Sequence, residues 1–582
     1  TSGRVADIAV NPKNPSEFYL AVASGNVWKT TNHGTTFTPI FDSYGSFSIG
    51  CVTLDPNNPN VVWVGTGENK SQRSVSFGDG VYLSRDGGKS FRNVGLKESA
   101  HVGMIRVDPR DSRIVYAAAM GPLWRDGGDR GLYRTTDGGE TWERILHISD
   151  QTGVNEVHLD PRDPDTLYAT AYQRRRHVWT LINGGPEGGI HKSTDGGRTW
   201  RAINSGLPGG DRGRIGLAVS PANPDIVYAI VEAAENSGGV YRSRDRGETW
   251  ERRNGYMSSS PQYYNELFAD PKNPDRFYTA DTYAHVSDDG GATLRALSIA
   301  DVHVDFHAFW INPDNTDHVI AGCDGGLYIT YDRVAWRHVT NLPVTQFYRV
   351  AVDNAVPFYN VYGGTQDNAT MGGPSRTLDA VGIANEHWFE TVGGDGFEPA
   401  IDPTDPNIVY SQWQHAGLIR FDRASGERVD IKPREKPGEA PHVWNWDTPL
   451  MISPHRHTRL YIASRVLHRS DDRGDSWTVI SPDLTRGLDR NQLPVLGKIQ
   501  KPDAVAKHMS TSIYGNSVSL SESPLVEGLI YVGTDDGLVH VTEDGGTTWR
   551  KIETFPGVPE MTYVSELETS RHVADRVYRS EE

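Results

Sequence analysis

The chain has 582 residues, 37% of them hydrophobic, and its formal net charge is −17. This length exceeds what one hydrophobic core serves, so several domains or an array of repeats are expected. The negative charge argues against general nucleic-acid binding, and no apolar run of about 18 residues is present to cross a membrane. Two cysteines make no disulfide framework, and the first residues, TSGRVADIAV, predict a strand rather than a signal peptide.

A strand–turn–strand phrase recurs along most of the chain. It reads VTLDPNNPNVVWVGTG from Val52, IRVDPRDSRIVYAAA from Ile105 and LAVSPANPDIVYAIV from Leu217. Each copy has an alternating apolar strand, a Pro/Asn/Asp turn and a second apolar strand. A third strand, an Asp-bearing turn and a fourth strand follow. Four short strands recurring roughly every fifty residues predict the blades of a β-propeller.

The Asp-bearing turn, typified by STDGGRTW at residues 193–200, is predicted to be scaffold. Its glycine pair supplies the positive φ angles of a tight hairpin, and its Asp and Ser/Thr satisfy turn backbone groups. Its Trp is expected to pack between blades. Phe37, Phe91 and Leu294 replace the Trp in three copies. A position that only packs apolar surface tolerates such changes, whereas a catalytic position would not.

These phrases resemble Asp-box (bacterial neuraminidase) repeats. Together with the DPxNP phrase they resemble the sortilin and xyloglucan-hydrolase families, and most closely bacterial sortilin-like proteins that are labelled glycosyl hydrolases. The resemblance covers essentially the whole chain. It implies a β-propeller and an extracytoplasmic, periplasmic or secreted, location. The motif is specific for the β-propeller architecture and gives almost no information about activity.

Counting first strands divides the chain into two propellers. Seven blades end near Leu342, so residues 1–342 are predicted to form one seven-bladed ring. Residues 343–582 are predicted to form most of a second ring, with blades eight to eleven, the start of a twelfth and an insertion at about 481–512. A single ten-bladed ring is the alternative. A half blade leaves an open edge, which further residues or another chain would complete.

A ligand is expected on the face opposite the Asp-bearing turns, around the central channel. The stretch IADVHVDFHAFWINP, from Ile299, occupies a first-strand position there. With a period of two, His303, Asp305 and His307 are predicted to point to one side. Such a row favours a catalytic or binding role or a satisfied polar network. The outer two are too far apart for one metal ion to take all three, though two adjacent groups could share an ion with a ligand from elsewhere.

Two repeats lack the Asp-bearing turn and carry YGGTQDNAT, from Tyr362, and ETVGGDGFEPAID, from Glu390. Their glycines let backbone approach a ligand closely. Asp367 and Asp395 are predicted catalytic acids there, and the alternative is ordinary Asx-turn chemistry. Further candidates are expected to bind substrate through amides, charges or stacking. They are Glu68, Asn69, Arg174, Arg175, Arg176, Trp179, Gln366, Asn368, Trp388, Trp413, Trp444 and Trp446.

Two functions follow from these residues. The first is a glycoside hydrolase using paired carboxyl groups, with Asp305, Asp367 and Asp395 as acids and His303 or His307 tuning one of them. The second is a non-enzymatic sortilin-like scaffold that binds a peptide or a partner chain. The net negative charge of the chain favours basic segments as its ligands. No cofactor is expected, and bound Ca²⁺ stays open because Asp/Asn turns mimic its sites.

The resemblance does not carry catalytic residues across. Xyloglucan hydrolases have an acid in an Asp-Ile/Val-Gly-Gly phrase early in the first ring, where this chain reads VASGNVWKT, residues 22–30. The Arg-Ile-Pro phrase of sialidases is missing, so sialidase action is not expected. The predicted ligand is a polysaccharide or a peptide.

Overall fold

The computed structural model describes residues 2–234, 237–297 and 302–580. This part of the chain is built almost entirely of antiparallel strands, with short 3₁₀ turns at Asn385–His387 and Arg490–Gln492. The strands form eleven four-stranded sheets and two two-stranded ones, and each four-stranded sheet follows chain order. The predicted all-β propeller fold is confirmed. No helix in the described ranges is long and apolar enough to span a bilayer.

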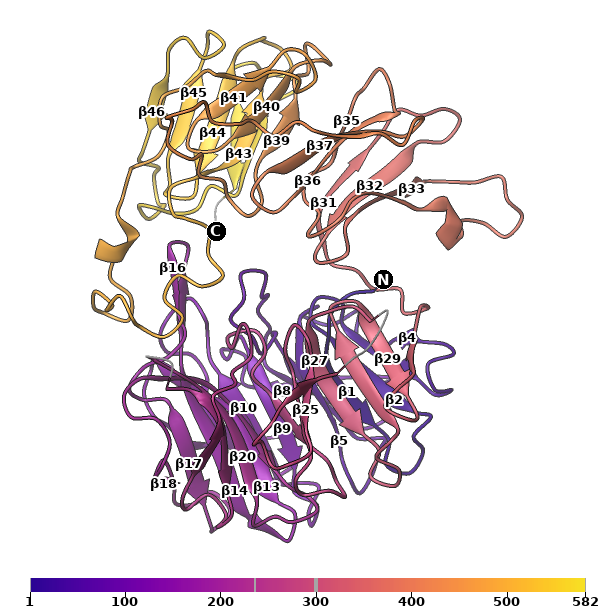
Figure 1. The fold of residues 1–582 in the computed structure, drawn as a ribbon, viewed down its shortest axis with the longest axis vertical. Helices are drawn as coiled ribbons and strands as arrows, with labels where there is room; N and C mark the ends of the chain where they lie inside the picture. Colours follow the sequence, from indigo (N-terminus) through magenta and orange to yellow (C-terminus); the bar gives the residue numbers. More distant parts are fainter. Residues whose placement is uncertain (1, 235–236, 298–301, 581–582) are drawn as a thin grey trace. The chain divides into compact units, whose positions relative to one another are not determined.

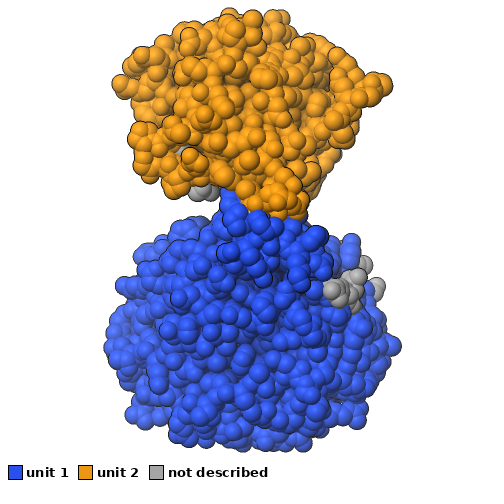
Figure 2. Space-filling view, turned by 90° about the vertical axis from the view of Figure 1, so that its left-hand side faces the viewer, with its two compact units in different colours: residues 1–345, 494–510 blue, residues 346–493, 511–582 orange. Residues whose placement is uncertain are grey.

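The chain divides into two compact units, coloured separately in Figure 2. Unit 1 comprises Thr1–Thr345 and Pro494–Ser510, and unit 2 comprises Gln346–Leu493 and Thr511–Glu582. The first boundary lies three residues beyond the Leu342 at which seven blades were predicted to end. The second part of unit 1 comes from the predicted insertion at about 481–512.

Unit 1 holds seven four-stranded sheets and one small hairpin, which stands out from the sheets (Figure 1). In chain order the seven sheets and, last, the hairpin are β1 (Val5–Val10), β2 (Phe18–Val22), β3 (Val27–Thr30), β4 (Thr38–Pro39); β5 (Ile49–Leu54), β6 (Val62–Thr66), β7 (Val81–Ser84), β8 (Arg92–Gly95); β9 (Val102–Val107), β10 (Val115–Met120), β11 (Arg130–Thr135), β12 (Glu143–Leu146); β13 (Thr152–Asp160), β14 (Asp163–Gln173), β17 (Gly189–Ser193), β18 (Arg201–Ala202); β19 (Arg212–Val219), β20 (Val227–Ala233), β21 (Gly239–Ser243), β22 (Glu251–Asn254); β23 (Leu267–Ala269), β24 (Phe277–Thr279), β25 (His285–Ser287), β26 (Arg295–Ala296); β27 (Phe306–Ile311), β28 (Val319–Cys323), β29 (Gly326–Thr330), β30 (Trp336–His338); and β15 (Arg175–His177), β16 (Thr180–Ile182).

Unit 2 holds four four-stranded sheets and a final strand pair. They are β31 (Phe347–Val352), β32 (Asn360–Thr365), β33 (Thr370–Pro374), β34 (Phe389–Val392); β35 (Ala400–Ile401), β36 (Ile408–Trp413), β37 (Gly417–Asp422), β38 (Arg428–Asp430); β39 (Leu450–Ile452), β40 (Leu460–Ala463), β41 (Leu467–Ser470), β42 (Thr478–Val479); β43 (Ser517–Glu522), β44 (Ile530–Thr534), β45 (Val539–Thr542), β46 (Arg550–Ile552); and β47 (Glu566–Thr569), β48 (Val577–Ser580).

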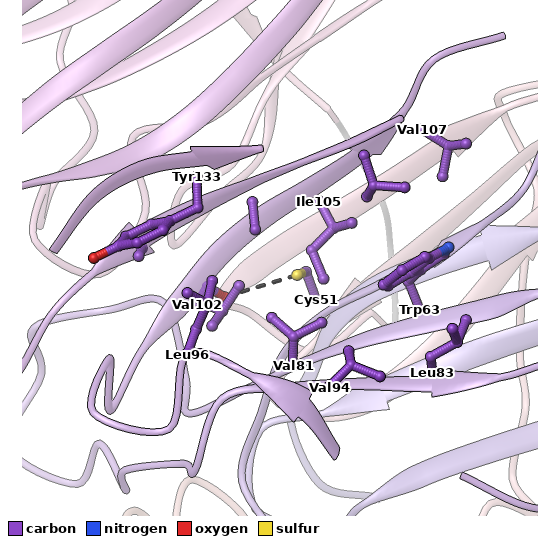
Figure 3. Close-up of a cluster of buried hydrophobic side chains, with 13 residues drawn as sticks. Cys51, Trp63, Val81, Leu83, Val94, Leu96, Val102, Ile105, Val107 and Tyr133 are labelled. Atoms are coloured by element: carbon purple, nitrogen blue, oxygen red, sulfur yellow. Dashed lines mark hydrogen bonds between the residues drawn. The ribbon is translucent and has the colours of Figure 1, made fainter. Parts of the chain in front are cut away.

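The sheets of unit 1 pack face to face into a closed circle. The first strand of each sheet lies innermost, so β1 contacts both β5 and β27. One apolar cluster joins the first sheet to the seventh through buried residues including Val5, Leu20, Ile320 and Leu327. A comparable cluster joins the second and third sheets around Trp63 (Figure 3). No strand is exchanged between these sheets, so side-chain packing closes the circle, together with a bond from the Ser2 backbone N–H to Gly325 O at 3.1 Å.

The Asp-bearing turn uses its own polar atoms, as the scaffold interpretation predicts. In the turn at 193–200, the Asp195 carboxylate accepts hydrogen bonds from the Thr199 backbone N–H at 2.9 Å and hydroxyl at 2.7 Å. Those bonds, led by the Thr199 hydroxyl, lower the pKa of Asp195 to about 2. Gly196 and Gly197 have φ values of 71° and 88°, which other residues rarely adopt. The turn therefore needs its acid for structure.

The first sheet of unit 2 leaves apolar side chains uncovered. Val350 and Val352 on β31 are 59% and 58% exposed, whereas the first strands of unit 1 bury most of their apolar positions. In the loop between β33 and β34, Leu378 and Val381 are 89% and 87% exposed. This sheet has one face without the cover that every sheet in unit 1 receives.

Replacement of Leu327 by Ala tests the closure of unit 1. Leu327 is fully buried between the first and seventh sheets, so we expect the free energy of unfolding of unit 1 to fall by about 2–5 kcal/mol. Val334→Ala, at a 77% exposed site of the same unit, should change it by less than about 0.5 kcal/mol. Calorimetry of both variants measures this difference. Equal unfolding temperatures for the two variants would contradict closure of the circle by side-chain packing.

Candidate functional site

The predicted site residues are distributed over both units. Unit 1 contains His303, Asp305, His307, Glu68, Asn69, Arg174, Arg175, Arg176 and Trp179. Unit 2 contains Asp367, Asp395, Gln366, Asn368, Trp388, Trp413, Trp444 and Trp446. Each group is described within its own unit.

The predicted row of His303, Asp305 and His307 on one strand is wrong in its geometry. Strand β27 begins at Phe306, and Asp305 has a φ of 68°, so the alternation of side chains does not reach back to His303. The backbone N–H of Asp305 donates to Thr282 O at 2.9 Å in the loop ahead of the strand. The opening of this stretch, residues 299–301, lies outside the described residues. The local apolar pattern predicted the strand but could not locate its first residue.

His307 belongs to a buried polar network in unit 1. Its Nε2 lies 2.8 Å from an oxygen of Asp324, whose other oxygen accepts from the Tyr263 hydroxyl at 2.5 Å and lies 3.3 Å from Arg4 Nη1. Arg4 also pairs with Glu68 at 2.9 Å. Burial holds the pKa of His307 well below its usual value, so the ring is neutral and donates to Asp324. Arg4 and Tyr263 were missed, because nothing local in the sequence marks them as partners.

A second buried cluster adjoins Lys70 in the same unit. Lys70 Nζ pairs with Glu266 at 2.5 Å, and Arg214 pairs with the same carboxylate. Burial opposes ionisation of Glu266, but the two cations hold its pKa below the usual value. Burial raises the pKa of nearby Glu232 to about 7, against hydrogen bonds from the Arg214 backbone and Asn183. These charges are paired with one another within the protein.

The arginine cluster, which the sequence predicts to bind substrate, is buried, and substrate binding by it stays a prediction. Arg174, Arg175 and Arg176 are 0%, 5% and 2% exposed. Arg174 donates to the Ser71 hydroxyl at 2.9 Å, and Arg176 to Ser510 O at 3.0 Å. These partners come from residues 70–71 and from Ser510, far along the chain in both directions, which no local pattern around the arginines reveals.

Unit 2 brings together two predicted acids. Asp395 follows β34, and Asp367 follows β32 with a φ of 60°. The Asp367 backbone N–H donates to Asp395 Oδ1 at 2.7 Å, and the indole N–H of Trp446 donates to Asp395 Oδ2 at 3.0 Å. Asp395 is only 4% exposed. Burial, followed by the charge of Asp367, raises the pKa of Asp395 to about 8. Asp395 is therefore protonated at neutral pH.

Glycines make this approach of two loops feasible. A Cβ on Gly364 would lie 1.9 Å from Phe397 O, and one on Gly396 would lie 2.3 Å from the Thr370 hydroxyl oxygen. Such contacts exclude any side chain at either position. The glycines therefore let the two loops meet, in addition to the close ligand approach that the sequence predicts for the Gly pairs.

The tryptophans of unit 2 divide into two kinds. Trp444 is 7% exposed, belongs to an apolar cluster and stacks on His468 with ring centroids 5.2 Å apart, so it serves packing. Trp388, at 38% exposed, Trp413 and Trp446 are more accessible. Trp446 combines partial exposure with a bond to Asp395. A stacking role for these three stays a prediction, as does substrate binding by Glu68, Asn69, Trp179, Gln366 and Asn368.

A further acid group of unit 2 was missed by sequence reasoning. Asp447 directly follows Trp446, and burial raises its pKa to about 6. Glu398 lies three residues after Asp395, and burial followed by the charge of Asp447 raises its pKa to about 7. Arg349 pairs with Glu566 at 3.0 Å and counteracts these shifts. The signal in the sequence is an acid just before a first strand, in EPAID and DTPLM.

Comparisons with known proteins point to propellers. A family model described as Sortilin, neurotensin receptor 3, matches residues 79–209. A probable oligoxyloglucan-reducing end-specific xyloglucanase of Neosartorya fischeri is 24% identical over 210 residues, 34% of this chain and 24% of that protein. A xyloglucanase of Hypocrea jecorina is 27% identical over 223 residues, 34% of this chain and 25% of that protein. The matched region thus spans about a quarter of the length of these relatives.

Two solved structures resemble the whole chain. The GH74 enzyme of Niastella koreensis has a TM-score of 0.52 and 17% identity, covering 97% of this chain and 86% of that one. The GH74 xyloglucanase of Xanthomonas campestris has a TM-score of 0.50 and 14% identity, covering 100% and 97%. At these identities the likeness shows a shared fold.

Replacement of Arg4 by Met tests the network of unit 1. The change leaves the buried Glu68 and Asp324 without their cation, so we expect a loss of about 3–5 kcal/mol in the free energy of unfolding. The matched control is Arg113→Met, which breaks an exposed pair with Asp111 and should cost less than about 1 kcal/mol. Equal denaturation midpoints for the two variants would argue against the network.

Asp395 should also make stability depend on pH. An unfolded Asp ionises near pH 4, whereas folded Asp395 keeps its proton to about pH 8. Stability is therefore lost as pH rises from about 4 to 8. Asp395→Asn removes this loss, on the order of a few kcal/mol. Urea unfolding across the window checks it, with Asp195→Asn as a control whose acid ionises below that range. Parallel wild-type and Asp395→Asn curves would refute the raised pKa.

Proposed function

We propose that this chain is a glycan-directed hydrolase and that Asp395 is its general acid. The observation that carries the proposal is a carboxyl group with a pKa of about 8, placed against a second carboxyl-bearing residue and a partly exposed indole. Glycoside hydrolysis needs one protonated carboxyl group to assist the leaving oxygen. The xyloglucanase names of the relatives support a β-glucan as the substrate class.

Glycoside hydrolysis also needs an ionised carboxylate. Asp447, with a pKa of about 6, is mostly ionised at pH 7 and follows the Trp446 that binds Asp395. A pair of acids whose pKa values are held apart is the usual arrangement for such a division of roles. We therefore assign to Asp447 the base or nucleophile role and to Asp367 the raising of the Asp395 pKa. Catalytic roles for Asp305, His303 and His307 stay predictions.

A polysaccharide of this class is too large to enter a cell, so the proposal includes action outside the cytoplasm. The competing proposal is a scaffold that binds peptides. It draws support from the sortilin family match at residues 79–209 and from the acids around Arg349, which complement a basic segment. In that case hydrolysis would be absent, and binding of a basic peptide would weaken in Asp447→Asn.

The test is hydrolysis of xyloglucan and other β-glucans by wild type, Asp395→Asn and Asp367→Asn. Loss of a general acid should lower kcat/KM by about 10²–10⁴-fold. Activity should fall above about pH 8 in wild type, where Asp395 ionises. In Asp367→Asn the like charge is gone, so the pKa of Asp395 drops and this basic limb should move to lower pH.

An aryl glycoside, whose leaving group needs no proton, separates chemistry from structure. Asp395→Asn should lose much less activity on it than on the polysaccharide. Glu427→Gln, at an exposed acid in the turn between β37 and β38, serves as the control and should match wild type. Equal losses on both substrates, or an unmoved basic limb in Asp367→Asn, would contradict Asp395 as the acid.

A further inference from the structure

The insertion predicted at about 481–512 is divided between the two units. Residues 494–510 lie in unit 1, and the residues directly before and after them lie in unit 2. The two ends in unit 2 are held together, because Arg490 Nη1 donates to Ser512 O at 3.0 Å and to the Thr511 hydroxyl at 3.4 Å. We call Arg490, Thr511 and Ser512 the stem of the insertion.

The stem holds the backbone of Trp446 in the same unit. The Trp446 backbone N–H donates to Ser512 Oγ at 2.9 Å, and this hydroxyl donates to Asn445 Oδ1 at 3.1 Å. A second contact comes from the turn between β36 and β37. There the His415 backbone N–H donates to Trp446 O at 3.3 Å, and the His415 ring meets the indole in a T-shaped arrangement with centroids 5.2 Å apart. Two segments distant in sequence therefore fix the position of Trp446.

The indole of Trp446 in turn holds the carboxyl group of Asp395. Its N–H donates to Asp395 Oδ2 at 3.0 Å, while the Asp367 backbone N–H donates to Oδ1 at 2.7 Å. Donors on both oxygens define the plane of a carboxyl group, whose rotation is otherwise only weakly restricted. A general acid must present its proton to the leaving oxygen in one orientation, so the loss of either donor misaligns it.

We propose that Trp446 is a positioning residue for Asp395 and that the stem of the insertion, through Ser512, keeps Trp446 in place. This inference rests on the proposed hydrolase function and gives the insertion a role in unit 2. The indole N–H also stabilises the ionised carboxylate. Burial and the charge of Asp367 raise the pKa of Asp395, and the bond from Trp446 opposes them.

The charged and titratable groups of the neighbouring segments do not differ between wild type and a Trp446 variant. Those groups are Asp367, Glu398, His415, Asp447 and Arg349. Trp446→Phe removes the N–H, keeps an aromatic ring and changes no charge. A change in the pKa of Asp395 in this variant therefore reports the lost bond.

The first test is hydrolysis of xyloglucan by Trp446→Phe across pH. We expect kcat to fall about tenfold, with a smaller change in KM, because the acid is misaligned. The basic limb should move to higher pH, opposite to its movement in Asp367→Asn, because ionised Asp395 has lost a donor. The matched control is Trp477→Phe, which loses an indole bond to Ile431 O of 2.7 Å in the same unit and should keep the wild-type limb.

The second test addresses the stem. Ser512→Ala removes the acceptor of the Trp446 backbone N–H, so it should move the basic limb in the same direction and lower kcat by about threefold. Ser512→Thr keeps a hydroxyl group and should behave as wild type. A Ser512→Ala variant with the wild-type limb and kcat would refute the role of the stem.

Urea unfolding between pH 4 and pH 10 gives a readout that needs no activity. Stability is lost as pH rises to the folded pKa of Asp395, about 8 in wild type. In Trp446→Phe this loss should continue to higher pH than in Trp477→Phe. An unmoved basic limb and an unmoved unfolding curve would overturn the proposal. A shifted unfolding curve in a protein that hydrolyses no β-glucan would support the Trp446 bond and refute the proposed function.

Discussion

The structure depends on the burial of both faces of each small sheet by its neighbours. A four-stranded sheet with apolar side chains on two sides is unstable alone, so successive sheets must stack around an axis until the last meets the first. In unit 1 the cluster that includes Val5, Leu20 and Leu327 completes this circle. Because apolar packing takes the sheet faces, polar side chains collect at the inner strand ends and in the connecting loops, where both acid groups of unit 2 lie.

Much of the fold could be predicted from the sequence because it is repetitive. Each repeat carries its own turn residues and strand periodicity, so eleven weak local signals reinforce one another. The approach of Asp367 and Asp395 was only partly predictable: the loss of the Asp-bearing turn in both repeats singled out these loops, and glycines such as Gly364 signalled close contact. The bond from Trp446 was not predictable, since it comes from a third repeat.

Other parts were beyond local patterns for physical reasons. The row at 303–307 failed because a single residue in the left-handed region, Asp305, breaks strand alternation without changing composition. The arginines at 174–176 look like a surface cluster, since charged residues are rarely buried. Arg176 donates to the backbone carbonyl groups of Ser71 and Ser510, Arg174 donates to the Ser71 hydroxyl, and Arg175 pairs with Asp126. Charge burial of this kind is decided by distant segments, which only a three-dimensional arrangement identifies.

The return of residues 494–510 to unit 1 has a consequence for biosynthesis. Those residues accept from Arg176 and bond to the backbone of the β15–β16 hairpin through Val505 and His508. A ribosome delivers them only after some 150 residues of unit 2 have emerged, as the bounds of the units show. During translation, the hairpin and the guanidinium groups of unit 1 therefore stay incompletely covered until residues 494–510 emerge. Maturation of the first circle is coupled to the emergence of the second unit, and the two cannot be separated by one cut in the gene.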